Sequence, residues 1–391
     1  MNDTEFSRNL LLEISKVGRK KSSIPSIKEI EPFEHFFKNE KLGDLDKRDG
    51  GLTRREILAR YLLLSAVLDQ GPDMEGVRLF LRNVINDLYR KEIRVFHRPL
   101  DFFKEIGISI DEILKVHKTV KEIRSVIWAK QNQSNPERYN LFMDNSKQAL
   151  NYAVFRWGVP LSVPLLLEKD LLKNNKESEQ PLIDYLESFE SSEIMSQELK
   201  GNERCGLGKA IGDKACHLFA KWYIHSFNLV KRKDFGWDKW SFESPFDSNA
   251  GRVLFRTGFL TIWANLDDYE DWDVIQKEGG KRNTHYIRVT NIRGHKSKKA
   301  LKEESLFEKY VEVCKEHLRI KSIPRSVEIQ QILNAILLGT DFGIGDLDDG
   351  LMHIGTSFCF NHENPKCDKC SLNKICKGFN EDKSLIKDYR T

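Results

Sequence analysis

The sequence predicts a mainly α-helical protein, because helix start signals and helical apolar spacing recur along the chain while strand signals are rare. Thr53 and Glu56 form a capping box in front of an apolar series that starts at Ile57. Ser109 and Glu112 form a second capping box of the same kind. Both patterns are typical of the first turn of an amphipathic helix.

Further segments carry the same periodicity. Helices are expected at residues 138–157, 210–230, 248–260 and 326–338. Gly158 and Pro160 are expected to break the first of these, because both residue types disfavour a helix interior. The only convincing strand signal is the β-branched segment 285–292. The predicted fold class is therefore mainly α.

The composition is that of an ordinary soluble protein, with 40% hydrophobic and 31% charged residues. A chain of 391 residues is long enough for two lobes or two domains. No apolar stretch reaches the roughly 18 residues that span a bilayer. The chain opens with Asn2, Asp3 and Glu5, which is unlike a signal peptide. We therefore expect a cytoplasmic protein without a membrane partner.

The net charge of +4 is small, but one segment concentrates positive charge. Residues 281–302 contain eight Lys or Arg residues and no acidic residue, with Lys296, Lys298 and Lys299 close together. Such a segment can neutralise the phosphates of a nucleic acid. Taken alone, it is equally well explained as a solvated surface loop.

Seven cysteines, an odd number, occur in a chain without a secretion signal, which argues against a disulfide framework. Cys205, Cys216 and Cys314 are scattered and are expected to be buried thiols. The other four follow the spacing C-x7-C-x2-C-x5-C near the C-terminus, and they are Cys359, Cys367, Cys370 and Cys376. Four thiolates at this spacing can bind a [4Fe–4S] cluster or a tetrahedral zinc ion, and the spacing alone does not separate the two.

The segment HIGTSFC leads to the first cysteine of this loop, and Pro365 stands two residues before the second. With these features the loop resembles the cysteine loop of endonuclease III and of the adenine glycosylases. Those proteins belong to the helix-hairpin-helix superfamily of DNA glycosylases, and their first gap has six residues where this chain has seven. The resemblance favours iron–sulfur over zinc. It implies a two-lobed glycosylase fold, made of a helical barrel lobe and a cluster lobe.

Two upstream segments resemble other parts of the same superfamily. Residues 210–214 resemble its hairpin and first helical turn, in which the backbone amide of Gly212 would bind a DNA phosphate and Lys214 would be the lyase lysine. Archaeal 8-oxoguanine glycosylases share this Asp-Lys opening. Residues 244–253 resemble the signature "hydrophobic-Asp-x-x-x-x-Arg-Val", which makes Asp247 the expected catalytic carboxylate. Without the family order, Asp247 would be interpreted as a helix N-cap.

These residue types suit the chemistry of base excision. A fixed carboxylate stabilises the positive charge that builds on the deoxyribose as the base leaves. A lysine with free amine can attack the sugar carbon, form a Schiff base and promote strand cleavage, whereas an exposed Lys214 would only contact phosphate. The target base has to leave the helical stack first. Gln70 is the candidate to fill the gap, with a surface turn as the equally good alternative.

The resemblance also implies a domain organisation. Residues 71–230 would form the barrel lobe, and residues 51–70 would join 231–391 in the cluster lobe with its loop at 359–376. Residues 1–50 would be an N-terminal extension, and residues 261–322 match no part of the family and would be an insertion.

The expected function is a monomeric, nucleoid-associated DNA glycosylase acting on double-stranded DNA, with an associated lyase activity at abasic sites. Two other classes of protein remain open. One is a DNA-binding protein that keeps the scaffold and the cluster without catalysis. The other is an iron–sulfur electron carrier, a role that requires neither the hairpin nor Asp247. The sequence does not identify the target base, nor does it separate DNA repair from defence against phage.

Overall fold

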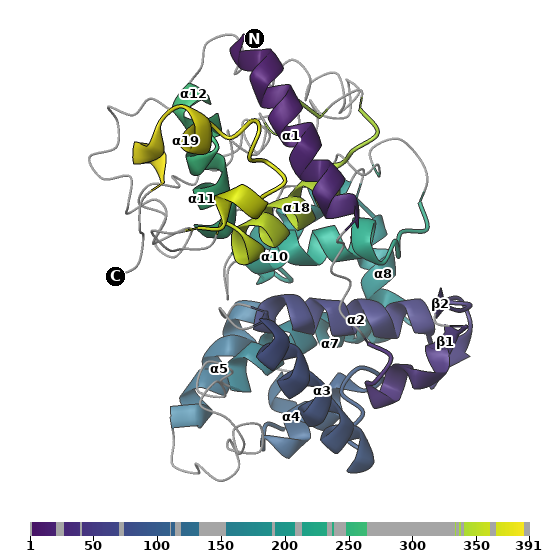
Figure 1. Ribbon diagram of the computed structural model, residues 1–391. Helices are drawn as coiled ribbons and strands as arrows, with labels where there is room; N and C mark the ends of the chain where they lie inside the picture. The colour runs from purple at the N-terminus through teal and green to yellow at the C-terminus, as the bar shows by residue number, and fades with distance from the viewer. Residues whose placement is uncertain are drawn as a thin grey trace, which may run out of the picture. The chain divides into compact units, whose positions relative to one another are not determined.

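The computed structural model describes most of the chain, and its helices account for most of the described part (Figure 1). The mainly α class predicted from the sequence is therefore confirmed. The described residues are 2–20, 27–39, 41–69, 74–109, 111–113, 119–132, 154–189, 192–207, 213–232, 237, 248–263, 333, 336–337, 340–359 and 365–386. The chain divides into two compact units, one of Ile24–Lys233 and one of Met1–Ser23 with Asp234–Thr391.

The Ile24–Lys233 unit is built around helix α2 (Arg54–Leu68), which packs against α7, α8 and α10. Every side chain of α2 except that of Arg55 is buried, so this helix is the centre of the unit's core. The other elements are η1 (Glu31–Phe36), β1 (Phe37–Lys38), β2 (Lys41–Leu42), β3 (Arg48–Asp49), β4 (Leu52–Thr53), α3 (Met74–Arg90), α4 (Pro99–Glu105), α5 (Val120–Asn132), α7 (Val154–Lys173), α8 (Pro181–Glu187), α9 (Ser192–Gly201), α10 (Asp213–Lys221) and the π-helix η6 (Trp222–Ser226).

Two short antiparallel pairs, β1 with β2 and β3 with β4, precede α2. Phe37 lies opposite Leu42 in the first pair, and Arg48 lies opposite Thr53 in the second. The sequence did not indicate these strands, because two residues are too few to show an alternating pattern.

Only one half of the predicted capping box forms at the start of α2. The Thr53 hydroxyl accepts a hydrogen bond from the backbone N–H of Glu56, as expected of an N-cap. The Glu56 carboxylate is fully buried and caps α8 instead, accepting hydrogen bonds from the backbone N–H groups of Leu182 (3.0 Å) and Ile183 (3.1 Å). One carboxylate thus ties the start of one helix to the start of another. The predicted cap at Ser109 is present, since its hydroxyl accepts a hydrogen bond from the backbone N–H of Glu112.

A buried arginine compensates the charge of Glu56. The Nε of Arg60 lies 2.7 Å from Glu56 Oε1, and Nη1 donates to the carbonyl of Phe96. A second carboxylate, that of Glu168 on α7, lies 2.8 Å from Arg60 Nη2. This ion-pair group joins α2, α7, α8 and the segment before α4 in the interior of the unit.

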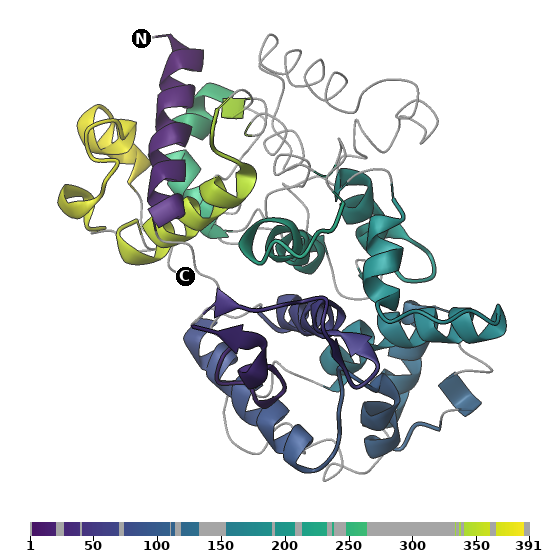
Figure 2. The same ribbon diagram turned by 90° about the vertical axis from the view of Figure 1, so that its right-hand side faces the viewer.

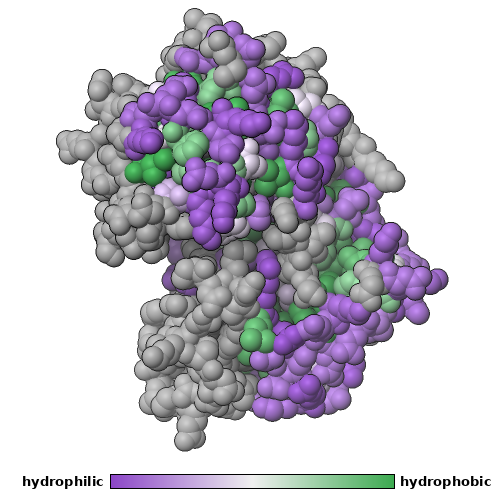
Figure 3. Space-filling model, viewed as in Figure 1, coloured by the Kyte–Doolittle hydropathy of each residue, from purple (hydrophilic) through white to green (hydrophobic). Residues whose placement is uncertain are grey.

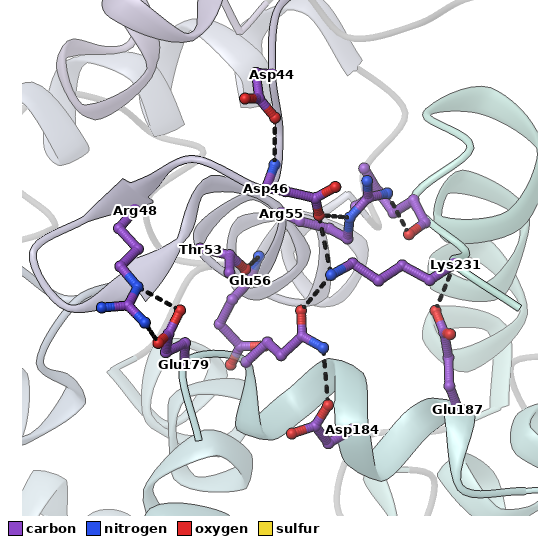
Figure 4. Close-up of polar contacts among 12 residues, drawn as sticks. Asp44, Asp46, Arg48, Thr53, Arg55, Glu56, Glu179, Asp184, Glu187 and Lys231 are labelled. Carbon is purple, nitrogen blue, oxygen red and sulfur yellow. Dashed lines mark hydrogen bonds and ion pairs between the residues drawn. The ribbon is translucent and has the colours of Figure 1, made fainter. Parts of the chain in front are cut away.

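A surface network extends these contacts to the end of the unit (Figure 4). Asp46 lies 3.0 Å from the ammonium of Lys231 and 3.3 Å from the guanidinium of Arg55. The hydrogen bond from Lys231 is the main reason that the pKa of Asp46 lies below its ordinary value. Glu187, at the end of α8, accepts a hydrogen bond from the backbone N–H of Lys231 and one from the Tyr223 hydroxyl. The last described residues of the unit are therefore fixed on α8.

Helix α7 corrects one prediction. It runs through Gly158, Pro160 and Pro164, where a break was expected at the first two. A Cβ at Gly158 would lie 2.3 Å from Cδ1 of Ile127, so glycine allows α5 to approach α7 closely. Burial against α2 and α5 outweighs the backbone hydrogen bond that each proline removes. Residues 138–153, the first part of the predicted helix, lie outside the described residues.

The other unit combines the two ends of the chain. Helix α1 (Asp3–Lys20) packs along α18 (Ile344–Ser357), and both views show the two helices side by side (Figures 1 and 2). A Cβ at Gly18 would lie 1.8 Å from the carbonyl oxygen of Asp346, so the two backbones are in contact. The remaining elements are α11 (Ser248–Arg256), α12 (Phe259–Trp263), η8 (Cys367–Lys369), α19 (Lys377–Asn380) and η9 (Lys383–Leu385).

The unit boundaries differ from the predicted lobes. Residues 1–50 are not one extension, because α1 belongs with the C-terminal part and residues 24–50 belong with α2. Residues 51–70, expected in the cluster lobe, lie in the Ile24–Lys233 unit. The helical spacing of Phe6, Leu10 and Ile14, all buried, was the signal for α1.

Two predicted elements, the strand at 285–292 and most of the helix at 326–338, lie outside the described residues. Within the described part of the chain, no helix is long and apolar enough to cross a membrane. The surface in Figure 3 is mostly hydrophilic where residues are described, and its hydrophobic patches are small.

We expect Glu56→Gln to destabilise the protein by about 3–5 kcal/mol, because it leaves a buried arginine short of its counter-charge and sets the amide NH2 group against one of the two backbone donors. Urea unfolding followed by circular dichroism measures this loss. The matched control is Glu179→Gln, which removes a partner of Arg48 in an exposed ion pair and should cost less than about 1 kcal/mol. Equal midpoints for Glu56→Gln and the wild type would contradict the role of Glu56.

Candidate metal centre

The four cysteines near the C-terminus line one cavity. It has about 380 Å³ of empty space, part of which is open to solvent. Each of the four cysteines is half-buried. Apolar side chains from α11, α18 and the loop complete the wall, and they are Val253, Ile354, Phe358, Leu372, Phe379 and Ile386. The structure therefore brings together the four predicted metal ligands.

Short turns place the cysteines around this cavity. Cys359 follows the end of α18, and its backbone N–H donates to the carbonyl of Ile354 (2.7 Å). The two-residue gap between Cys367 and Cys370 is a 3₁₀ turn, closed by a hydrogen bond from the Cys370 N–H to the Cys367 carbonyl (3.0 Å). Cys376 is the N-cap residue of α19. Tight local turns thus place successive cysteines on the wall of one cavity.

Two arginines of α11 hold the first cysteine. Arg252 donates from Nε to the carbonyl of Cys359 (2.7 Å) and from Nη2 to the carbonyl of Gly355 (3.0 Å), in the last turn of α18. One helical turn later, Nη1 of Arg256 lies 3.7 Å from Sγ of Cys359. The Cys376 thiol donates to the carbonyl of Arg256 (3.4 Å). Helix α11 therefore contacts both the first and the last cysteine.

Arg252 and Arg256 were not among the predicted site residues. Both are nearly inaccessible, at 5% and 1% exposure. Their spacing of four residues places them on one face of a helix, and this was the available signal. A buried guanidinium next to a cysteine suits a site in which that cysteine carries negative charge.

Burial keeps three of the thiols protonated in the absence of a metal. It raises the pKa of Cys367, and it raises the pKa of Cys370 to about 11 and that of Cys376 to about 12. A metal that binds here has to displace these protons, because the ligand is the thiolate.

The cysteines share a cavity without converging on a point. Among the described residues, no group of three or more His, Cys, Asp or Glu side chains is placed to hold a single metal ion. A single tetrahedral zinc ion bound at 2.3 Å needs its sulfur ligands about 3.8 Å from one another. A [4Fe–4S] cluster binds one cysteine at each iron and accepts a wider set of thiols. Four cysteines on one cavity are the donor set that a [4Fe–4S] cluster uses.

Of the other predicted site residues, only Lys214 is among the described residues. Lys214 lies in the first turn of α10 and its side chain is exposed. The remaining ones lie outside the described residues, and they are Gln70, Gly212, Asp247, Lys296, Lys298 and Lys299. Asp247 directly precedes Ser248, the first residue of α11. Cys205 and Cys216 are buried, as predicted, and Cys314 lies outside the described part of the chain.

Comparison with known proteins does not place the chain in a family. No protein-family model, curated protein or solved structure matches it. Function is therefore inferred from the residues of the chain itself.

We expect the purified protein to be yellow-brown, to absorb near roughly 400 nm and to contain about four iron atoms per chain. Cys370→Ser should lose most of this iron, because it removes one of the four ligands of the cavity. Cys205→Ala is the matched control, since Cys205 is a buried thiol of the other unit and should leave the iron content unchanged. A colourless wild type with one zinc per chain would contradict the cluster.

Proposed function

We propose that the protein is an iron–sulfur DNA glycosylase of the helix-hairpin-helix superfamily, which excises a damaged or modified base from double-stranded DNA. One observation carries the proposal. Asp247 directly precedes α11, the helix whose Arg252 and Arg256 contact Cys359. The residue expected to be catalytic and the loop expected to bind the cluster are thus linked through one helix.

The two-lobed organisation supports the same proposal. The unit that holds the cysteine loop is assembled from both ends of the chain, and the intervening residues form a separate helical unit. The resemblance also implies a cluster lobe split in two around a helical lobe, although its N-terminal segment is here residues 1–23 and not the expected 51–70. The segment expected to form the hairpin, residues 210–214, leads into α10 of the helical unit.

In the proposed reaction, the Asp247 carboxylate stabilises the positive charge on the deoxyribose and helps to deprotonate the attacking nucleophile. Gln70 fills the space left by the flipped nucleotide. The cluster, when bound, supplies a rigid scaffold for a loop with little apolar core of its own. Arg252 and Arg256 orient that loop on α11.

The exposure of Lys214 bears on the proposed lyase activity. A side chain in the first turn of α10, next to Gly212 of the expected hairpin, is well placed to contact a DNA phosphate. A Schiff-base lysine is typically activated by a desolvated pocket or by a neighbouring cation. The exposure of Lys214 therefore favours base excision by water, with strand cleavage as the additional activity to be tested.

We expect Asp247→Asn to reduce base release by about two to four powers of ten, or roughly 3–5 kcal/mol of barrier, because the amide no longer stabilises the sugar cation. The measurement is the formation of abasic sites in a panel of duplexes with oxidised, mismatched or hypermodified bases. DNA binding should survive. Asp111→Asn, at an exposed aspartate of the other unit, is the control and should keep full activity. If Asp247→Asn releases bases at the wild-type rate, the protein is better explained as a non-catalytic DNA-binding protein.

Lys214→Gln separates the two roles of that lysine. If Lys214 contacts phosphate only, the variant should bind DNA several-fold more weakly and keep base release, and neither wild type nor variant should form a covalent adduct under borohydride. Lys104→Gln, at an exposed lysine of α4, should change neither property. An adduct that forms with the wild type and is lost in Lys214→Gln would show that Lys214 is the nucleophile of a lyase.

A further inference from the structure

The residue after the last cysteine contacts the N-terminal helix. Lys377 directly follows Cys376, and its ammonium lies over the ring of Phe6, 4.6 Å from the ring centroid. Phe6 is a residue of α1 and is only 5% exposed. A cation above an aromatic face is attracted by the ring's quadrupole, and partial burial strengthens this attraction. The contact joins residues at opposite ends of the chain.

The stem of Lys377 is fixed as well. Gly258 has a φ of +87° in the turn between α11 and α12, and a Cβ at this position would lie 2.7 Å from Cδ of Lys377. Glycine thus provides both the left-handed turn and the space for the lysine stem. The backbone N–H of Lys377 donates to the carbonyl of Thr257 (3.2 Å). Lys377 is therefore held at its backbone, its stem and its ammonium.

The other end of α1 is anchored to the helix that leads to the first cysteine. Arg19 lies 3.0 Å from Oδ2 of Asp346 and over the ring of Phe342. Asp346 also caps α18, since it accepts a hydrogen bond from the N–H of Gly343 (3.0 Å). Helix α18 ends two residues before Cys359. Helix α1 thus contacts the structure on both sides of the cysteine loop.

We infer that α1 is a positioning element for the metal centre, in which Phe6 and Lys377 form a clasp that fixes Cys376 relative to Cys359. The inference rests on the proposed binding of a metal cluster by the four cysteines. A ligand that is held in place from outside the loop leaves the metal more slowly, because its departure then requires the clasp to open. The clasp therefore governs retention of the metal.

The test measures iron release from the full-length, metal-loaded protein to a chelator, followed by the loss of absorbance near roughly 400 nm. Phe6→Leu keeps an apolar side chain but removes the aromatic face, and Lys377→Met keeps the stem but removes the charge. Each should speed iron release by about two- to fivefold, the range expected of a partly exposed cation–π contact. Lys377→Arg should restore slow release, since a guanidinium also lies favourably on an aromatic ring.

Two comparisons distinguish an effect of the clasp on iron release from an effect of lower protein stability. The double variant should release iron no faster than either single variant, because both remove the same contact. Lys369→Met, at an exposed lysine next to Cys370, should release iron at the wild-type rate. Additive effects in the double variant, or unchanged release in Phe6→Leu and Lys377→Met, would overturn the clasp and leave the proposed cluster intact. A wild type that binds no metal would overturn both.

Discussion

The cysteine loop depends on side chains that come from outside it. Between residues 365 and 386 the described chain buries only Leu372 and Gly378, so it has almost no core of its own. Its position is set instead by Arg252 and Arg256 on α11 and by Gly258, which leaves room for the stem of Lys377. A metal site on such a loop is only as rigid as the helices that hold it. The retention proposed for the metal follows from that dependence.

The position of the cysteine loop depends, secondly, on the close crossing of α1 and α18. Gly18 and Gly350 lie where a Cβ would meet the backbone of the facing helix, at 1.8 Å and 2.1 Å from a carbonyl oxygen. The contact between Arg19 and Asp346 spans 327 positions of sequence. A unit assembled from residues so far apart cannot be completed until the C-terminal part of the chain exists, and such non-local contacts slow folding. The helical unit, by contrast, is a continuous segment.

That continuous unit is organised by a buried charge. Glu56 uses its carboxylate to cap α8 and to compensate Arg60, which in turn reaches Phe96 and Glu168. Buried ion pairs give little net stability against an apolar core, but removing one partner is costly. The arrangement therefore specifies which helices meet. It also fixes α8, on which the final residues of the unit are anchored through Glu187 and Lys231.

The sequence by itself determined what depends on neighbouring residues. The N-caps at Thr53 and Ser109 and the grouping of four cysteines are local features, and the structure has all of them. Tertiary structure alone decided that α7 continues through Pro160 and that α1 joins the C-terminal unit. It also directed Arg252 and Arg256 to Cys359, about 100 positions away. These outcomes depend on packing between distant segments, and packing can outweigh local propensity because most of a helix's stability comes from burial of its apolar face.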